Sequence, residues 1–203
     1  MCDSGVAAII LAAGGSTRLG RPKQLLSFGG ETLVARVVRI VQAASFAPVV
    51  LVTGANAPEV EAATGASGVV AAFNPDWQAG MGGSIRTGVV ALLAVNAPFD
   101  AVLLLVCDQP FVSEELLRRL CDTRESTGAT IVASEYGGTW GVPCLFDKTV
   151  LPELAALDGA SGARAIIERH RRSGDAVAVS FPEGVADVDT PADWERLGGV
   201  WRE

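Results

Sequence analysis

Short apolar runs that read as buried strands alternate with longer amphipathic stretches, and this alternation limits the fold more than any other feature. Strands are expected at Val6–Leu11, Val49–Val52, Val69–Ala72, Ala101–Val106, Thr130–Ala133, Val142–Phe146 and Ala176–Phe181. Helices are expected at Glu31–Ala44 and Glu59–Ala63, after caps at Ser84 and Ser113, and at Gly162–His170 behind Ser161. This order predicts an α/β fold of three layers, with a mostly parallel sheet and helices on both faces. No repeat or break in composition divides the chain, so residues 1–203 are expected to form a single domain.

The composition excludes several classes of protein. Hydrophobic residues make up 49% of the chain and charged residues 19%, which excludes a disordered protein. The formal net charge of −7 does not suit nonspecific binding to nucleic acid or to an anionic membrane, so neither is an expected partner. The apolar runs are too short to span a bilayer, and Met1–Gly5 lacks the basic segment that begins a signal peptide. We therefore expect a cytoplasmic protein.

The cysteines and the single histidine do not form a recognisable site. Cys2, Cys107, Cys121 and Cys144 show no CxxC spacing, so a zinc site is not expected. Free thiols are the expectation for a cytoplasmic chain. With His170 alone, a catalytic triad that needs a histidine base is not expected either.

A glycine-rich segment follows the first expected strand, where residues 11–26 read LAAGGSTRLGRPKQLL. The segment combines two glycines, two hydroxyls and two cations, namely Gly14, Gly15, Ser16, Thr17, Arg18 and Lys23. Glycine lets a ligand approach the backbone closely, and hydroxyls, amides and cations bind phosphate oxygens. These features favour a polyphosphate cradle over a plain turn with solvated basic side chains. The spacing matches neither the P-loop nor the dinucleotide fingerprint GxGxxG.

The segment resembles the signature of the MobA-like nucleotidyltransferases, LAAGxSxRxGxxKxLL. Further segments of that family follow in the family's order at Asn74–Trp77, Gly80–Ser84, Cys107–Pro110, Gly162–Arg164 and Asp187–Pro191. Together they cover nearly the whole chain. Within the family, Leu11-Ala12-Ala13-Gly14 with Asp108-Gln109-Pro110 resembles the molybdenum cofactor cytidylyltransferases, whereas the guanylyltransferases typically carry LAGG.

The resemblance implies a Rossmann-like nucleotidyltransferase fold that uses Mg²⁺. The implied reaction transfers CMP from CTP to the terminal phosphate of molybdopterin and releases pyrophosphate. The implied partners are CTP, molybdopterin or a similar phosphorylated acceptor, and a molybdoenzyme that receives the product. The N-terminal half is expected to bind the nucleotide and the C-terminal half the acceptor.

Attack on phosphorus needs positioning and charge neutralisation rather than a protein nucleophile. The expected catalytic residues are Arg18, Lys23 and Asp108, with the two cations on the β- and γ-phosphates. Asp108 follows a buried strand, where a carboxylate is costly unless it is paired or metal-bound. It is the first expected metal ligand, with the capping of a turn as the alternative role. Asp189 is the second expected ligand, and one of Asp187, Asp189 and Asp193 is expected to be the N-cap of a following helix.

The expected nucleotide-binding residues combine the glycine-rich segment with positions that the family match suggests. They are Leu11, Ala12, Ala13, Gly14, Gly15, Ser16, Asn74, Gly80 and Ser84. Met81 is left open between packing and a place in the pocket. The tryptophans Trp77, Trp140, Trp194 and Trp201 are expected to pack rather than to stack on a base.

Two departures from the family pattern fall in the second half of the chain. Gly141-Val142-Pro143 lacks the histidine that often precedes this proline, and Ala160 stands where Gly-Asp-x-Gly-Ala-Arg often has aspartate. Both changes remove polar groups from the half expected to bind the acceptor. A sugar- or alditol-phosphate nucleotidyltransferase therefore remains an alternative. A non-catalytic nucleotide-binding module that delivers molybdenum cofactor is the other alternative.

Overall fold

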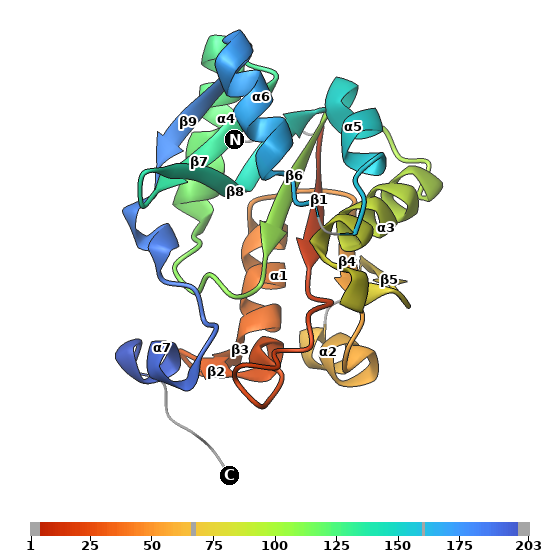
Figure 1. Ribbon diagram of the computed structural model, residues 1–203. Coiled ribbons are helices and arrows are strands. Elements are labelled where there is room, and N and C mark those ends of the chain that lie inside the picture. The colour runs from red at the N-terminus through yellow and green to blue at the C-terminus, as the bar shows by residue number, and fades with distance from the viewer. Residues whose placement is uncertain (1–4, 66–67, 160, 199–203) are drawn as a thin grey trace.

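A computed structural model describes residues 5–65, 68–159 and 161–198. Its main sheet has the strand order β5-β4-β1-β6-β8-β7-β9 (Figure 1). The strands are β1 Val6–Leu11, β4 Val49–Thr53, β5 Val69–Phe73, β6 Ala101–Val106, β7 Ile131–Tyr136, β8 Thr139–Asp147 and β9 Ala176–Ser180. All the strands expected from the sequence are present, with ends that differ by a few residues.

β8 is antiparallel to both of its neighbours, β6 and β7. The other pairings in the sheet are parallel, so the prediction of a mostly parallel sheet is confirmed. The reversal between β7 and β8 takes place at Gly137 and Gly138, whose φ angles are 55° and 72°. Two consecutive residues with positive φ form the kind of tight turn that joins adjacent antiparallel strands.

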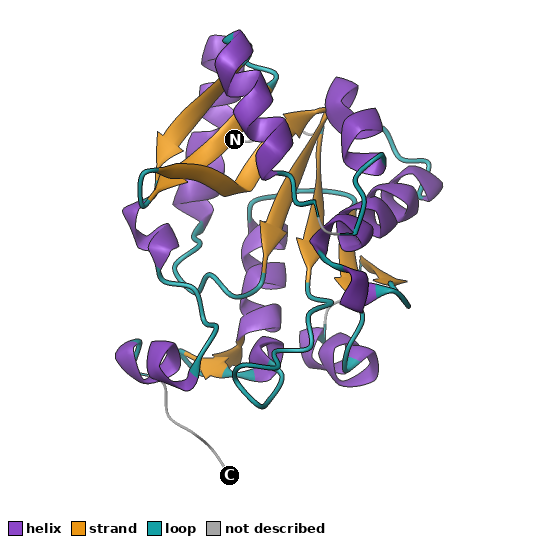
Figure 2. Cartoon of the chain, in the orientation of Figure 1, coloured by secondary structure: helices purple, strands orange, loops and turns teal. Residues whose placement is uncertain are grey.

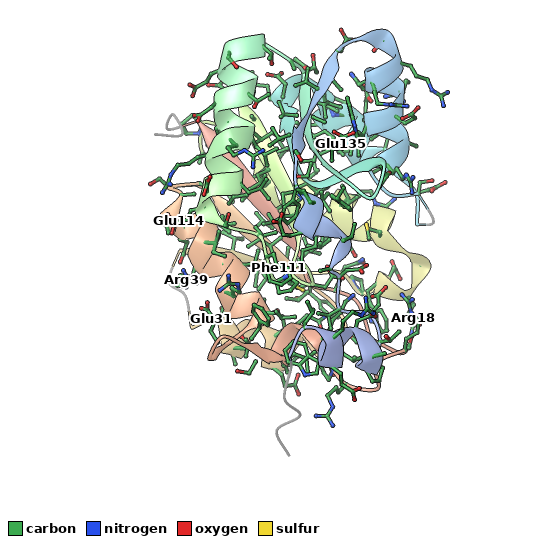
Figure 3. The ribbon with its side chains drawn as sticks, turned by 90° about the vertical axis from the view of Figure 1, so that its left-hand side faces the viewer. Arg18, Glu31, Arg39, Phe111, Glu114 and Glu135 are labelled. Atoms are coloured by element: carbon green, nitrogen blue, oxygen red, sulfur yellow. The ribbon has the colours of Figure 1, made fainter. Side chains whose placement is uncertain are left out.

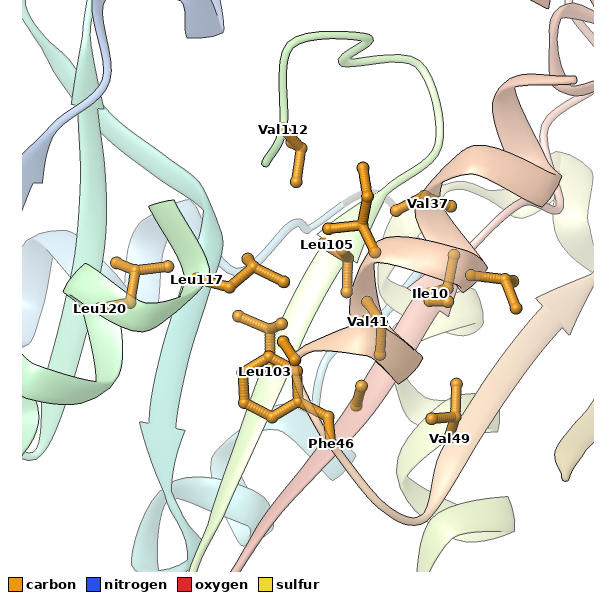
Figure 4. Close-up of a cluster of buried hydrophobic side chains, with 14 of the residues drawn as sticks. Ile10, Val37, Val41, Phe46, Val49, Leu103, Leu105, Val112, Leu117 and Leu120 are labelled. Carbon is orange, nitrogen blue, oxygen red and sulfur yellow. The ribbon is translucent and has the colours of Figure 1, made fainter. Parts of the chain in front are cut away.

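Helices cover both faces of the sheet (Figures 1 and 2). The face that Figure 4 shows packs against α1 Leu33–Ala43, α2 Ala57–Thr64 and α4 Glu114–Thr127. The opposite face packs against α3 Met81–Ala94, α5 Leu151–Ala155 and α6 Arg164–Ser173. Apolar side chains alternate along each strand between these two clusters, as in Ala8 and Ile10 on one face and Ala7 and Ile9 on the other. The predicted three-layer fold is confirmed.

A smaller apolar cluster lies at the carboxyl end of β1. It joins the hairpin of β2 Ser27–Phe28 and β3 Glu31–Thr32 to α7 Pro191–Arg196, which lie beside each other in Figure 1. Its fully buried members include Leu33 and Trp194. Four short 3-10 turns complete the described elements, at Lys23–Leu25, Trp77–Ala79, Lys148–Val150 and Pro182–Val185. This cluster brings the C-terminal part of the chain back to the glycine-rich loop.

Four helix starts differ from the sequence expectations. α2 begins at Ala57, two residues before the expected Glu59. α1 begins at Leu33 because Glu31 and Thr32 pair in the hairpin, and the Thr32 side chain caps the helix. α3 begins at Met81 behind Gly80, so Ser84 lies within its first turn and is not its cap. α6 begins at Arg164 behind Ala163 rather than at Ser161. Ser113 caps α4 as predicted.

The cysteines are only partly as expected. Cys107 and Cys144 are buried free thiols, whereas Cys121 is disulfide-bonded, so the expectation of a free thiol is wrong for Cys121. Spacing along the chain carried no sign of this bond, because the fold decides which thiols meet. Cys2 lies outside the described residues. Within the described ranges, none of the helices has the length and apolar character needed to cross a bilayer.

Candidate active site

The carboxyl ends of β1 and β6 form a switch point in the sheet. β1 pairs in parallel with β4 on one side and with β6 on the other. After β1 the chain forms β4 and β5 on one side and then crosses to form β6 on the other side. In open α/β sheets, ligands bind in the crevice that such a reversal opens beyond the strand ends. The glycine-rich loop follows β1 there, and Cys107 and Asp108 follow β6.

The glycine-rich loop folds around the side chain of Gln24. Gln24 is 1% exposed, and its Nε2 donates to the carbonyl oxygens of Ala12 at 2.8 Å and Gly14 at 2.7 Å. Ser16 has a φ of 51°, and its Oγ accepts a hydrogen bond from the Lys23 amide at 3.0 Å. Breaking a buried hydrogen bond leaves a polar group unsatisfied, so these contacts hold the loop in one shape. Sequence reasoning gave Gln24 no role, because its partners are backbone carbonyls that no side-chain pattern reveals.

An ion network joins this loop to the end of β6. Lys23 Nζ donates to the carboxylates of Asp108 and Asp189 and lies 2.9 Å from Asp189 Oδ1. Arg18 Nη2 lies 2.7 Å from Asp189 Oδ2. The Arg18 side chain is 69% exposed at the surface (Figure 3). The structure therefore brings together the two predicted cations and the two predicted metal ligands.

The network favours the charged forms of Lys23 and Asp189. Burial works against the ammonium of Lys23, but Asp108 and Asp189 outweigh it and raise the Lys23 pKa. Burial likewise works against the Asp189 carboxylate, but hydrogen bonds and charge from Lys23 and Arg18 lower the Asp189 pKa. Asp187 behaves in the opposite way, because burial and repulsion by Asp189 and Asp108 raise its pKa.

Two hydrogen bonds hold the segment before α7 against the end of β6. The Val188 amide donates to Asp108 O at 3.1 Å, and Gln109 Nε2 donates to Gly184 O at 3.2 Å. Gln109 is buried, and sequence reasoning quoted it in a motif without giving it this role. These two hydrogen bonds fix the position of the segment before α7, so that the Asp189 carboxylate lies within hydrogen-bond distance of Lys23.

The expectation that an aspartate caps α7 is wrong. Thr190 is the N-cap: its Oγ1 accepts from the Asp193 amide at 3.2 Å, while the Asp193 carboxylate accepts from the Thr190 amide at 2.8 Å. This reciprocal pair is a capping box. Because Thr190 takes the capping role, Asp189 faces the ion network instead.

A cavity of about 210 Å³ lies between the glycine-rich loop, the start of α3 and the end of β6. Its lining comprises Leu11, Ala12, Ala13, Gly14, Lys23, Gln24, Trp77, Gly80, Met81, Ser84, Val106, Cys107 and Asp108. The other predicted site residues, Gly15, Ser16, Arg18, Asn74 and Asp189, are not in that lining. Met81 belongs to the cavity, which answers the question that the sequence left open.

Two residues outside the lining shape the cavity from behind. A Cβ at Gly15 would lie 2.6 Å from a ring atom of Trp77, so glycine there is what lets the indole reach the cavity wall. Asn74 is buried, and its Nδ2 donates to Ser84 Oγ at 3.0 Å. Trp77 therefore packs as expected and also lines the cavity, while Trp194 is fully buried away from it. Trp201 lies outside the described residues.

Two carboxylates that share one cation are a suitable pair of ligands for a divalent metal that completes its shell with phosphate oxygens and water. Asp108 and Asp189 meet this description, because both bind Lys23 Nζ. Within the described ranges, no group of three or more metal-binding side chains gathers at one point. A metal here would depend on oxygen ligands from a substrate.

Comparison with known proteins agrees with this geometry. The family model of the MobA-like NTP transferase domain matches residues 8–174. The chain is 31% identical to nicotine blue oxidoreductase of Paenarthrobacter nicotinovorans, over 95% of this chain and 96% of that protein. It is also 31% identical to molybdenum cofactor guanylyltransferase of Rhodobacter capsulatus, over 94% of each chain.

A similar solved structure is the complex of Rv0371C from Mycobacterium tuberculosis H37Rv with manganese. It has a TM-score of 0.72 and 31% identity, and the match covers 95% of this chain and 97% of that one. These two curated relatives carry different names for their activities. The match to the family model spans most of the described sheet, from β1 through α6, and the chain belongs to the MobA-like NTP transferase domain family.

Proposed function

We propose that this protein transfers CMP from CTP to the terminal phosphate of molybdopterin and releases pyrophosphate. The observation that carries the proposal is the meeting of Lys23, Asp108 and Asp189 beside one cavity at the carboxyl ends of β1 and β6. Membership of the NTP transferase family supports the reaction class. The name of the Rhodobacter relative supports molybdenum cofactor as the acceptor class.

The residues suit an in-line displacement at phosphorus. A triphosphate that enters the cavity competes with Asp108 and Asp189 for the Lys23 ammonium and meets Arg18 at the rim. Both cations then face the pyrophosphate, where they stabilise the charge that develops as it leaves. Amides of the loop held by Gln24 give further donors in a fixed geometry.

We further propose Mg²⁺ as the metal, with Asp108 and Asp189 as its protein ligands. The two carboxylates fit it, because Mg²⁺ takes one or two carboxylates together with phosphates and water. When bound, the ion would neutralise phosphate charge. The manganese complex of the Mycobacterium relative supports a divalent ion in this family. The transfer of Lys23 from the carboxylates to the phosphates would leave Asp108 and Asp189 open to the metal.

The choice of CTP rests on Leu11-Ala12-Ala13-Gly14 and Asp108-Gln109-Pro110, which resemble the cytidylyltransferase branch. A curated relative named as a guanylyltransferase makes GTP the competing nucleotide. The nucleotide is proposed to occupy the N-terminal half, with Asn74 and Ser84 near the base and ribose, and the acceptor to occupy the C-terminal half of one domain.

The test is pyrophosphate release from CTP, GTP, ATP and UTP with Mg²⁺ and molybdopterin, with the product identified by mass spectrometry. We expect release with CTP and the mass of the cytosine dinucleotide. Release with GTP alone would keep the transferase and overturn the choice of base. Release only with sugar or alditol phosphates would favour that alternative. Nucleotide binding without release under any acceptor would favour the delivery module.

A further inference from the structure

The nucleotide cavity runs across the carboxyl end of β1, from the end of β6 to the end of β4. β1 lies between these two strands in the sheet (Figure 1). Neighbouring strands are roughly 4.8 Å apart, so the ends of β4 and β6 are about 10 Å from each other. Asp108 follows β6 and lines one end of the cavity. Trp77 lines the other end, where it packs against Gly54, the residue after β4. The cavity therefore has a charged end and an aromatic end.

The Trp77 side chain is wedged between two glycines. A Cβ at Gly15 would lie 2.6 Å from Cη2 at the outer edge of the indole, and a Cβ at Gly54 would lie 2.7 Å from Trp77 Cβ. Both ends of the side chain are thus pressed against backbone. That backbone is itself tied down, because the Ala55 amide donates to Ala13 O at 3.0 Å. In such close packing, an indole cannot turn aside when a ligand presses on it.

The turn that carries Trp77 is also held in place. Asn74 is buried in front of this turn. Its Oδ1 accepts from the Asp76 amide at 3.0 Å, and its Nδ2 donates to Ser84 Oγ at 3.0 Å. These two bonds join the 3-10 turn Trp77–Ala79 to the first turn of α3. A buried side chain with both polar ends satisfied fixes its surroundings, so Trp77 forms a rigid end wall.

We propose that Trp77 is a size filter that admits a pyrimidine base and rejects a purine. The inference rests on the proposed function for its direction, because a triphosphate near Lys23 and Asp108 turns its base toward Trp77. A purine carries a second fused ring and reaches farther along the cavity. A wall that cannot yield rejects the larger base by steric overlap. The filter acts on ring size alone, so it separates CTP from GTP and ATP and leaves the choice between CTP and UTP to other contacts.

The test compares the dissociation constants of CTP and GTP in Mg²⁺, measured by calorimetry without any acceptor. The wild type should bind CTP more tightly than GTP. We expect Trp77→Leu to raise the affinity for GTP relative to CTP about tenfold, the lower end of what pocket size contributes to discrimination. Trp77→Phe keeps an aromatic wall and should give a smaller shift. Phe73→Leu is the matched control, because Phe73 is exposed at the end of β5 and does not line the cavity.

The ratio of the two affinities separates a filter from a structural role, since damage to the fold weakens both nucleotides together. A ratio unchanged in Trp77→Leu, equal binding of CTP and GTP by the wild type, or the same shift in Phe73→Leu would overturn the inference. Loss of both nucleotides in Trp77→Leu and Trp77→Phe alike would also overturn it.

The same variants distinguish this inference from the proposed function. A ratio that shifts in Trp77→Leu, in a wild type that transfers no CMP to molybdopterin, would support the filter while the proposed function fails. Transfer of CMP by the wild type, with a ratio that Trp77→Leu leaves unchanged, would support the function and refute the filter.

Discussion

The nucleotide cavity beside Lys23 and Asp108 adjoins a second cavity of about 260 Å³, which is lined mainly by β8, α6 and their neighbours. The two cavities differ in how they use charge. In the nucleotide cavity, Lys23 and Asp108 pair with each other, and Asp189 links them to Arg18 at the rim. In the second cavity, Arg164 is exposed to solvent and the rest of the lining is mainly apolar. Paired charges can exchange partners when a polyphosphate and a metal arrive together, whereas an apolar wall selects a ligand by its shape.

The two cavities also differ in how firmly their backbone is held. The glycine-rich loop is held by a buried glutamine that satisfies two carbonyl oxygens, so its amides stay in place without a ligand. The second cavity instead depends on contact between the start of α3 and the loop before α6. The fixed glycine-rich loop suits a triphosphate, which is common to all nucleotide substrates. The wall of the second cavity, formed by α3 and the loop before α6, is the part that can differ between acceptors.

The largest expected effect comes from Asp108→Asn, which removes charge from the nucleotide cavity alone. We expect turnover to fall at least ~100-fold, as when one preorganised electrostatic contact to the reacting groups is lost. The measurement is steady-state pyrophosphate release. Asp122→Asn, exposed on α4, is the control, and full activity of Asp108→Asn in Mg²⁺ would refute the assignment of Asp108.

Gly82→Ala should disturb the packing of the start of α3 against the loop before α6, which lies between the two cavities. A Cβ at Gly82 would lie 1.7 Å from Asp158 O and 2.5 Å from Ser161 O, both backbone atoms that cannot yield cheaply. We expect a loss of about 2 kcal/mol or more of unfolding free energy, in the range of overpacking. Chemical denaturation measures the loss. Gly83→Ala is the matched control, because its Cβ would meet Asn74 Nδ2 at an ordinary 3.7 Å; equal losses in the two variants would contradict the account.

Lys23→Met tests whether the ammonium of Lys23 competes with a metal for Asp108 and Asp189. Removing the cation leaves two carboxylates that repel each other, so the nucleotide-free variant should bind Mn²⁺ more tightly than the wild type, by about tenfold. Titration followed by electron paramagnetic resonance measures the affinity. Binding unchanged or weakened by Lys23→Met would show that these carboxylates are not the metal ligands.

The smallest expected effect concerns a pair far from both cavities. Arg124 Nη2 lies 2.8 Å from Asp147 Oδ2. Burial opposes the Asp147 charge, but hydrogen bonds from Thr149 and Arg124 outweigh it and lower the pKa of Asp147. Because the pKa of Asp147 is lower in the folded state, its charge stabilises the fold at pH values above the unfolded-state pKa, near 3.8. This contribution is lost as the pH falls through the lower pKa of the folded state. Asp147→Asn should therefore cost about 0.5–1 kcal/mol at pH 7 and progressively less in acid.

Unfolding measured by denaturant at pH 7 and in acid checks this prediction, and substrate binding at pH 7 should be unchanged. If the loss of unfolding free energy in Asp147→Asn grew in acid, the pKa of Asp147 would be raised and not lowered by folding, which would contradict the prediction. Weakened CTP binding would mean that charges at the far end of the sheet also shape the nucleotide cavity.

Sequence patterns predicted the sheet because buried strands such as Val6–Leu11 and Ala101–Val106 are continuous apolar runs. They also predicted Lys23 as a phosphate-binding cation and Asp108 and Asp189 as metal ligands, and these three side chains meet in the structure. The reversed strand β8 and the roles of Gln24 and Gln109 were not predicted, since they depend on backbone partners distant in sequence. The start of α3 was misplaced because Ser84 has the chemistry of a cap, while Gly80 occupies the position.

Calorimetric titration with CTP, GTP, ATP and UTP in Mg²⁺, on the wild type and on Lys23→Ala, tests the central claim most directly. The account predicts selective binding of CTP by the wild type and loss of most of that binding in Lys23→Ala. Triphosphate binding that is unchanged in Lys23→Ala, or no binding of any triphosphate by the wild type, would contradict the claim that this cavity is built for a nucleoside triphosphate.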